Sequence, residues 1–65
     1  MYLTDLIAHE LRRRGHDPET WAGERHGVTV QTLAGMLTGR LPAVPAVLLD
    51  LSETTGITPS CAQAA

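Results

Sequence analysis

The sequence predicts a small all-α domain of four to five short helices, and three observations support this prediction. Hydrophobic residues recur at the helical spacings i, i+3 and i+4 in several separate segments. Capping residues or prolines stand at the start of these segments, and glycines stand at their ends. Tryptophan and tyrosine occur once each and phenylalanine is absent, while 43% of the 65 residues are hydrophobic. This composition favours one compact helical domain over residues 1–65 and argues against disorder.

The first predicted helix spans residues 4–14. The apolar residues that share one face of it are Leu3, Leu6, Ile7 and Leu11. Thr4 is the expected N-cap, and the three arginines 12–14 lie in the last turn, where cations oppose the negative end of the helix dipole. Gly15 ends the helix.

Asp17-Pro18-Glu19 is a strong start signal for a second helix over residues 18–25. Aspartate is a favoured N-cap, proline is favoured at the first helical position, and glutamate suits the positive end of the dipole. Trp21 and Ala22 are the expected inward residues, and Gly27 follows the helix.

The third predicted helix spans residues 29–38, with Thr29 as its N-cap and Gly39 after its end. The expected inward residues are Leu33, Met36 and Leu37. The residues expected mostly on the opposite face are Val30, Gln31, Ala34, Gly35 and Thr38. A strand through residues 28–30 is rejected, because the chain offers no second strand to pair with it.

A proline-rich connection over residues 41–45 leads to the fourth predicted helix, residues 45–55. The apolar residues that mark this helix are Val44, Val47, Leu48 and Leu51. Gly56 ends it. Thr58-Pro59 repeats the combination of cap and proline, so a short fifth helix is predicted over residues 59–64.

The charge is unusual for a protein that binds nucleic acid. Five arginines and no lysines face seven acidic residues, which gives a net charge of −2. All five arginines lie between Arg12 and Arg40, together with three acids, so this part of the chain carries a local excess of positive charge. The distribution predicts a weakly basic face on one side of the domain.

Several classes of function are not expected. No apolar run reaches the ~18 residues that a membrane span needs, and residues 1–11 lack the features of a signal peptide, so a cytoplasmic protein is expected. Cys61 has no second cysteine to form an intrachain disulfide. The histidines 9, 16 and 26 and Cys61 lack zinc-ligand spacing, and there is no glycine-rich phosphate loop. We therefore expect no enzyme, no metal and no cofactor.

Helices two and three, joined by a short turn that contains Gly27, have the pattern of a helix-turn-helix. The motifs are RGHDPETWA (14–22), GVTVQTL (27–33), Gly39-Arg40 and GITP (56–59). In this order and spacing they make the chain resemble the Cro/phage-repressor-type helix-turn-helix proteins, the Xre family. The resemblance covers almost the whole chain. It implies a compact lambda-repressor-like domain that binds double-stranded DNA.

In that family the start of the third helix enters the major groove. The resemblance therefore assigns base readout to Thr29, Val30, Gln31, Thr32 and Gly35. Gln31 can form two hydrogen bonds with adenine, and Val30 or the threonine methyl groups can contact thymine methyls. Phosphate contacts are assigned to Thr20, Arg25 and Arg40. The arginines 12–14 stay open between phosphate binding and a solvated helix end.

The resemblance implies a transcriptional regulator, a small Cro-like repressor that binds a palindromic operator as a homodimer. The expected dimer interface lies at the end of the fourth helix and beyond it: Leu51, Thr55, Ile57, Pro59 and Cys61. The alternative is a protein-interaction module on the same fold, an antitoxin or accessory subunit with weak or no DNA binding. The connection 40–44 favours this alternative, because it contains only one charged residue and so offers few contacts to phosphate groups.

Overall fold

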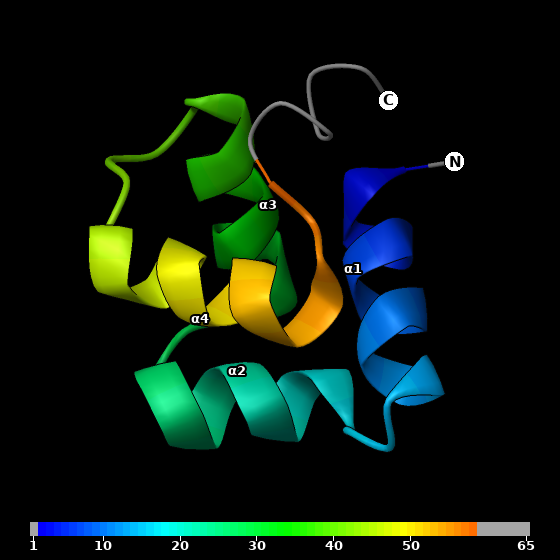
Figure 1. Cartoon of the computed structure of the whole chain (residues 1–65). Helices are drawn as coiled ribbons and strands as arrows, with labels where there is room; N and C mark the ends of the chain where they lie inside the picture. The colour runs from blue at the N-terminus through cyan, green and yellow to red at the C-terminus, as the bar shows by residue number, and fades with distance from the viewer. Residues whose placement is uncertain (1, 59–65) are drawn as a thin grey trace.

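The computed structural model describes residues 2–58, which form four α-helices and no strand (Figure 1). The helices are α1 (Leu3–Arg13), α2 (Pro18–His26), α3 (Val30–Thr38) and α4 (Pro45–Thr55). The all-α prediction is confirmed, with the helices of residues 2–58 at the lower end of the predicted number. The predicted helix over residues 59–64 lies outside the described residues.

Local hydrogen bonds begin α2 and α3 where the sequence predicts. The Asp17 carboxylate accepts the backbone N–H of Thr20 at 3.0 Å, and Pro18 takes the first helical position of α2. The Thr29 hydroxyl accepts the backbone N–H of Thr32 at 3.1 Å and caps α3. These side chains satisfy N–H groups that have no partner within the helix.

The start of α1 differs from the prediction. The helix begins at Leu3, and Tyr2, with an extended backbone and no side-chain hydrogen bond, occupies the N-cap position that was predicted for Thr4. The Tyr2 carbonyl accepts the backbone N–H of Leu6 at 3.0 Å. Leu3 and Leu6 both pack against the core, so the extra residue places one more leucine on the buried face.

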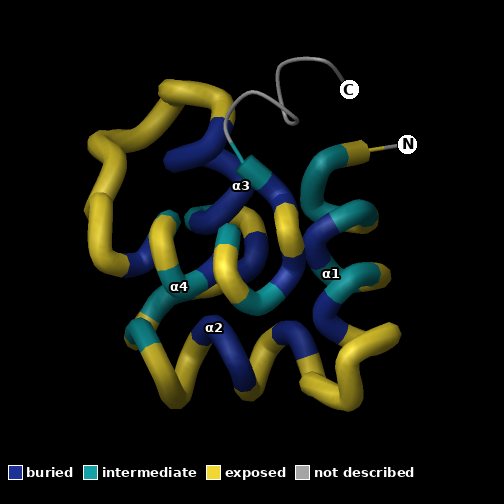
Figure 2. The backbone as a smooth tube through the Cα atoms, in the orientation of Figure 1, coloured by how far each residue is buried: buried dark blue, intermediate teal, exposed yellow. Residues whose placement is uncertain are grey.

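α3 packs against each of the other three helices, as α1 does, and Figure 2 shows much of the α3 backbone as buried. Six of its nine residues are buried. The largest side chains with no exposure are Ile7, Leu11, Leu33 and Leu51, which come from α1, α3 and α4. Truncating a fully buried leucine of this kind to alanine costs about 2–5 kcal/mol. No helix between residues 2 and 58 is long and apolar enough to traverse a lipid bilayer.

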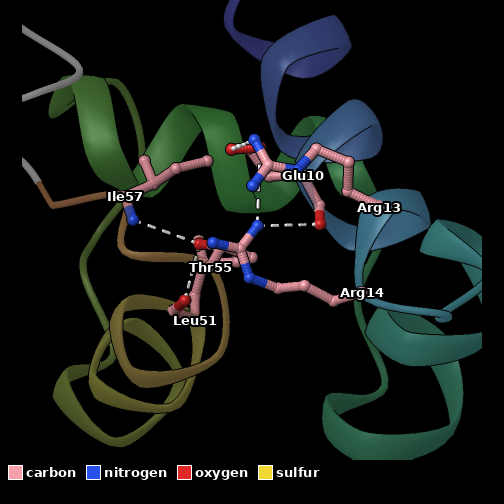
Figure 3. Close-up of polar contacts among 6 residues, drawn as sticks. All are labelled: Glu10, Arg13, Arg14, Leu51, Thr55 and Ile57. Atoms are coloured by element: carbon pink, nitrogen blue, oxygen red, sulfur yellow. Dashed lines mark hydrogen bonds and ion pairs between the residues drawn. The ribbon is translucent and has the colours of Figure 1, made fainter.

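Three of the predicted dimer residues belong to this core. Leu51, Thr55 and Ile57 are 0%, 3% and 5% exposed. The Thr55 hydroxyl donates to the Leu51 carbonyl at 2.7 Å and accepts the Ile57 N–H at 3.2 Å (Figure 3). The prediction that these side chains form a dimer surface is wrong, because they close the core at the end of α4. The other two predicted interface residues, Pro59 and Cys61, lie outside the described residues.

Candidate nucleic-acid interface

The connection between α2 and α3 consists of three residues, Gly27 to Thr29. Gly27 has a left-handed backbone with φ of 65°, which a residue with a side chain rarely adopts, and its N–H donates to the Gly23 carbonyl at 2.9 Å. The Val28 N–H donates to the Ala22 carbonyl at 3.1 Å, and the Val28 side chain packs against the core. The start of α3 is therefore held in a fixed position relative to α2.

The first turn of α3 presents polar side chains to solvent. Thr29 and Gln31 are exposed and Thr32 is half-buried. The hydroxyl oxygens of Thr29 and Thr32 lie 3.0 Å apart and share a hydrogen bond. The Gln31 amide makes no hydrogen bond or ion pair with any residue of the described chain. Its donor and acceptor are both available to an external partner.

Val30 does not share this surface, which corrects the prediction for it. Its side chain is 4% exposed and belongs to the hydrophobic core. The buried stripe of α3 runs through Val30, Leu33, Ala34 and Leu37, a regular i, i+3, i+4, i+7 pattern. The predicted inward residues Leu33, Met36 and Leu37 are all buried, and the buried face also includes Val30 and Ala34, which were predicted mostly on the opposite face.

Gly35 is also buried, because Leu41 folds back over it. The N–H groups of Arg40 and Leu41 both donate to the Gly35 carbonyl, at 2.9 and 3.1 Å, and this brings the chain back along α3. A Cβ atom at position 35 would lie 2.6 Å from Cδ1 of Leu41. Leu41 is 43% exposed, so its side chain, and not the Gly35 backbone, forms this part of the surface. Leu41 was predicted only as part of the connection to the fourth helix and not as part of this surface.

Arg25 is not a free cation. Its Nε and Nη2 donate to the two carboxylate oxygens of Asp50, at 2.9 and 3.1 Å, and its guanidinium carbon lies 5.7 Å from the Trp21 ring centroid. The Asp50 hydrogen bonds raise the pKa of Arg25, and the Arg25 hydrogen bond is the main reason that the pKa of Asp50 is lowered. His26 Nε2 is 2.7 Å from the same carboxylate. Arg25 therefore fastens α2 to α4.

Thr20 is exposed but lies beside a carboxylate. Hydrogen bonds from its backbone N–H, and secondly from its hydroxyl, lower the pKa of Asp17. An open cleft of about 290 Å³ runs past this position. Its lining residues are Gly15, His16, Asp17, Thr20, Trp21, Glu24 and Arg25. Two carboxylates, Asp17 and Glu24, line it, and the one guanidinium, that of Arg25, is already paired with Asp50, so the electrostatics of the cleft oppose a phosphate.

The remaining arginines divide into two groups: two pair with Glu10, and two, Arg12 and Arg40, are exposed without an ion pair to any described residue. Arg13 and Arg14 each lie 3.4 Å from a carboxylate oxygen of Glu10 (Figure 3), which supports the solvated helix end over phosphate binding. Arg40 is exposed, and its Nε donates to the Thr38 hydroxyl at 3.3 Å. No acidic side chain in the part of the chain that the structure describes pairs with Arg40.

The predicted site residues thus separate along α3. Thr29, Gln31 and Thr32 lie together at its first turn, whereas Arg40 lies just beyond its end. Nine helical residues rise by about 13 Å, so Arg40 lies at the opposite end of the helix from the other three. Among the described residues, no group of three or more histidine, cysteine or acidic side chains could hold a metal ion. Comparisons of the chain with protein-family models, with curated proteins and with solved structures gave no match.

Proposed function

We propose that the chain is a sequence-specific DNA-binding transcriptional regulator, a small Cro-like repressor whose α2 and α3 form a helix-turn-helix. The observation that carries the proposal is the first turn of α3. It presents the exposed Gln31 amide between two hydroxyl-bearing residues, Thr29 and Thr32, on a helix that the core holds in place. A rigid helix end with free hydrogen-bonding groups is the element that reads base edges in the major groove.

Each of these residues is assigned a separate contact with the DNA. Gln31 pairs with an adenine through its amide, and the Thr29 and Thr32 methyl groups contact thymine methyls. The side chain of Leu41, which covers Gly35, makes an apolar contact with the DNA in place of Gly35. Arg40 supplies a phosphate contact near the other end of α3. Occupation of an operator then blocks transcription by excluding the polymerase from the promoter.

Selection from a random library of double-stranded DNA at low salt tests this proposal. The intact chain should enrich a motif with two-fold symmetry that contains an adenine at a defined position. Gln31→Ala should relax the preference at that position and cost about 1–3 kcal/mol there. His9→Ala, which removes an exposed polar side chain from α1, is the matched control and should leave the motif unchanged. Enrichment of no motif would contradict the proposal.

The second candidate is the protein-interaction module. It is favoured by the ion pairs that hold Arg13, Arg14 and Arg25 within the chain, because paired cations contribute little to phosphate binding. An intact, folded chain that selects no DNA at low salt would favour this candidate. In that case the Gln31 surface would be tested next against proteins of the host cell.

A further inference from the structure

Arg40 differs from Arg25 in the group that holds its guanidinium. Arg25 donates Nε and Nη2 to the two oxygens of a carboxylate, so its charge is compensated within the chain. Arg40 donates Nε to the Thr38 hydroxyl at 3.3 Å and has no ion pair with any described residue. A hydroxyl accepts the hydrogen bond but carries no charge. The contact therefore orients the Arg40 side chain and leaves its positive charge available to an external partner.

The Thr38 hydroxyl is itself held by α3. Its one proton points back along the helix, where the carbonyl oxygens of Ala34 and Gly35 lie 3.0 and 3.2 Å away. Because the helix uses this proton, the hydroxyl oxygen acts towards Arg40 only as an acceptor. The hydrogen bonds thus run in one direction, from the guanidinium to the hydroxyl and from the hydroxyl to the helix carbonyls.

The backbone at Arg40 is also held in place. Gly39 ends α3 with a left-handed backbone, φ of 81°, and its N–H donates to the Met36 carbonyl at 3.4 Å. The Arg40 N–H donates to the Gly35 carbonyl at 2.9 Å, which completes a Schellman motif. Figure 2 shows the segment that follows as exposed. The side chain of Arg40 therefore starts from a fixed backbone and is held at Nε, while the N–H groups of both Nη atoms have no partner among residues 2–58.

We propose that Thr38 is a positioning residue, whose hydroxyl holds the Arg40 guanidinium with both Nη groups free for a backbone phosphate of DNA. Two N–H groups of one guanidinium can bind two phosphate oxygens at once. A long side chain that is already oriented loses less conformational entropy when it binds. The proposal rests on the proposed function for its DNA partner. Phosphate contacts do not depend on base sequence, however, so the two proposals can be tested apart.

Fluorescence anisotropy with a DNA duplex of arbitrary sequence at low salt measures the phosphate contact. Thr38→Val keeps the shape of the side chain and removes the hydroxyl, so it should weaken binding about two- to fivefold. Thr38→Ser keeps the hydroxyl and should bind as the wild-type chain does. Thr54→Val makes the same change on α4, at a threonine whose hydroxyl has no hydrogen bond with the described residues. It is the matched control and should leave the affinity unchanged.

The salt dependence separates a positioning role from a loss of charge. Arg40→Gln removes the positive charge and should reduce the magnitude of the slope of log affinity against log salt by about 1 per bound chain. Thr38→Val retains the charge, so it should lower the affinity at each salt concentration and leave the slope unchanged. In the Arg40→Gln background, Thr38→Val should cause no further loss, because the hydroxyl then has no guanidinium to orient.

NMR of the free chain follows the hydrogen bond without DNA. The Nε–H of Arg40 should exchange with water about two- to fivefold faster in Thr38→Val than in the wild-type chain, and Thr38→Ser should restore the slower exchange. Backbone amide chemical shifts of residues 30–41 check that α3 and the Schellman motif persist in both variants.

Three results would overturn the positioning role: wild-type affinity in Thr38→Val, an unchanged exchange rate of the Arg40 Nε–H, or a loss that persists in the Arg40→Gln background. The last result would mean that Thr38 contacts the DNA itself. A chain that selects a DNA motif but tolerates Thr38→Val overturns only the positioning role. A chain that needs Thr38 to bind duplex DNA but selects no motif overturns only the sequence-specific function, and a chain that binds no duplex overturns both.

Discussion

Gly35 and Gly23 both lie inside helices, yet their surroundings differ. At Gly23 an added Cβ would meet one atom, the Val28 carbonyl oxygen at 4.0 Å, which is ordinary contact. At Gly35 the added Cβ would lie 2.6 and 2.9 Å from two side-chain atoms of Leu41. Replacing glycine by alanine inside a helix is worth up to about 1 kcal/mol where nothing obstructs it.

Gly23→Ala should therefore stabilise the chain by about 0.5–1 kcal/mol. Gly35→Ala gains the same helix propensity but pushes Leu41 off α3, so its free energy of unfolding should be about 1 kcal/mol below that of Gly23→Ala. Urea unfolding followed by circular dichroism measures both values. Equal stabilisation by the two substitutions would mean that Leu41 does not hold its place over Gly35.

At the scale of elements, a polar cluster fastens α2 to α4. Asp50 on α4 accepts hydrogen bonds from Arg25 and lies 2.7 Å from Nε2 of His26, both of which belong to the last turn of α2. The Trp21 ring meets His26 edge to face with centroids 5.1 Å apart. The cluster joins residues more than twenty positions apart, so it stabilises the relative placement of two helices.

The lowered pKa of Asp50 makes this cluster sensitive to acid. Because the pKa lies below the ordinary value of 3.8 in the folded chain, the contribution to stability is present above that value and is lost as the pH falls through the folded pKa. Asp50→Asn should cost about 1–2 kcal/mol at neutral pH and almost nothing once the pH lies below the folded pKa of Asp50. Unfolding free energies measured from neutral to acidic pH check this. A cost that is independent of pH would contradict it.

The elements were largely predictable because their signals are local. Asp17 and Thr29 cap helices through hydrogen bonds to residues three positions away, so the sequence pattern contains both partners. The candidate site was less predictable because its surface depends on distant residues. Leu41 covers Gly35 only because the chain turns back after α3, and Arg25 meets Asp50 from another helix. No periodicity along one helix encodes these contacts.

At the scale of the whole molecule, most of the positive charge is already paired. Arg13 and Arg14 share Glu10, and Arg25 pairs with Asp50, whereas Arg12 and Arg40 are exposed without an ion pair in the described part of the chain. Under the proposed function, binding to DNA then releases few counterions, and base contacts contribute more to affinity than phosphate neutralisation does.

The slope of log affinity against log salt for a selected operator should accordingly be shallow, about −3 to −5 for two copies. Arg40→Gln should reduce its magnitude by about 2, one phosphate per copy. Arg13→Gln, which removes a charge already held by Glu10, is the control and should leave the slope unchanged. Fluorescence anisotropy titrations over a range of salt concentrations measure all three. A slope near −10 would mean that other groups meet the backbone.

The fold of Leu41 over Gly35 has a consequence for how this surface can diverge. The two positions are six residues apart, yet the side chain at one occupies the space that a side chain at the other would need. A lineage that acquires a larger residue at position 35 must accept a smaller or displaced residue at position 41, and both changes alter the outer face of α3. Substitutions at positions 35 and 41 are therefore coupled, so the two positions should covary among descendants of this chain.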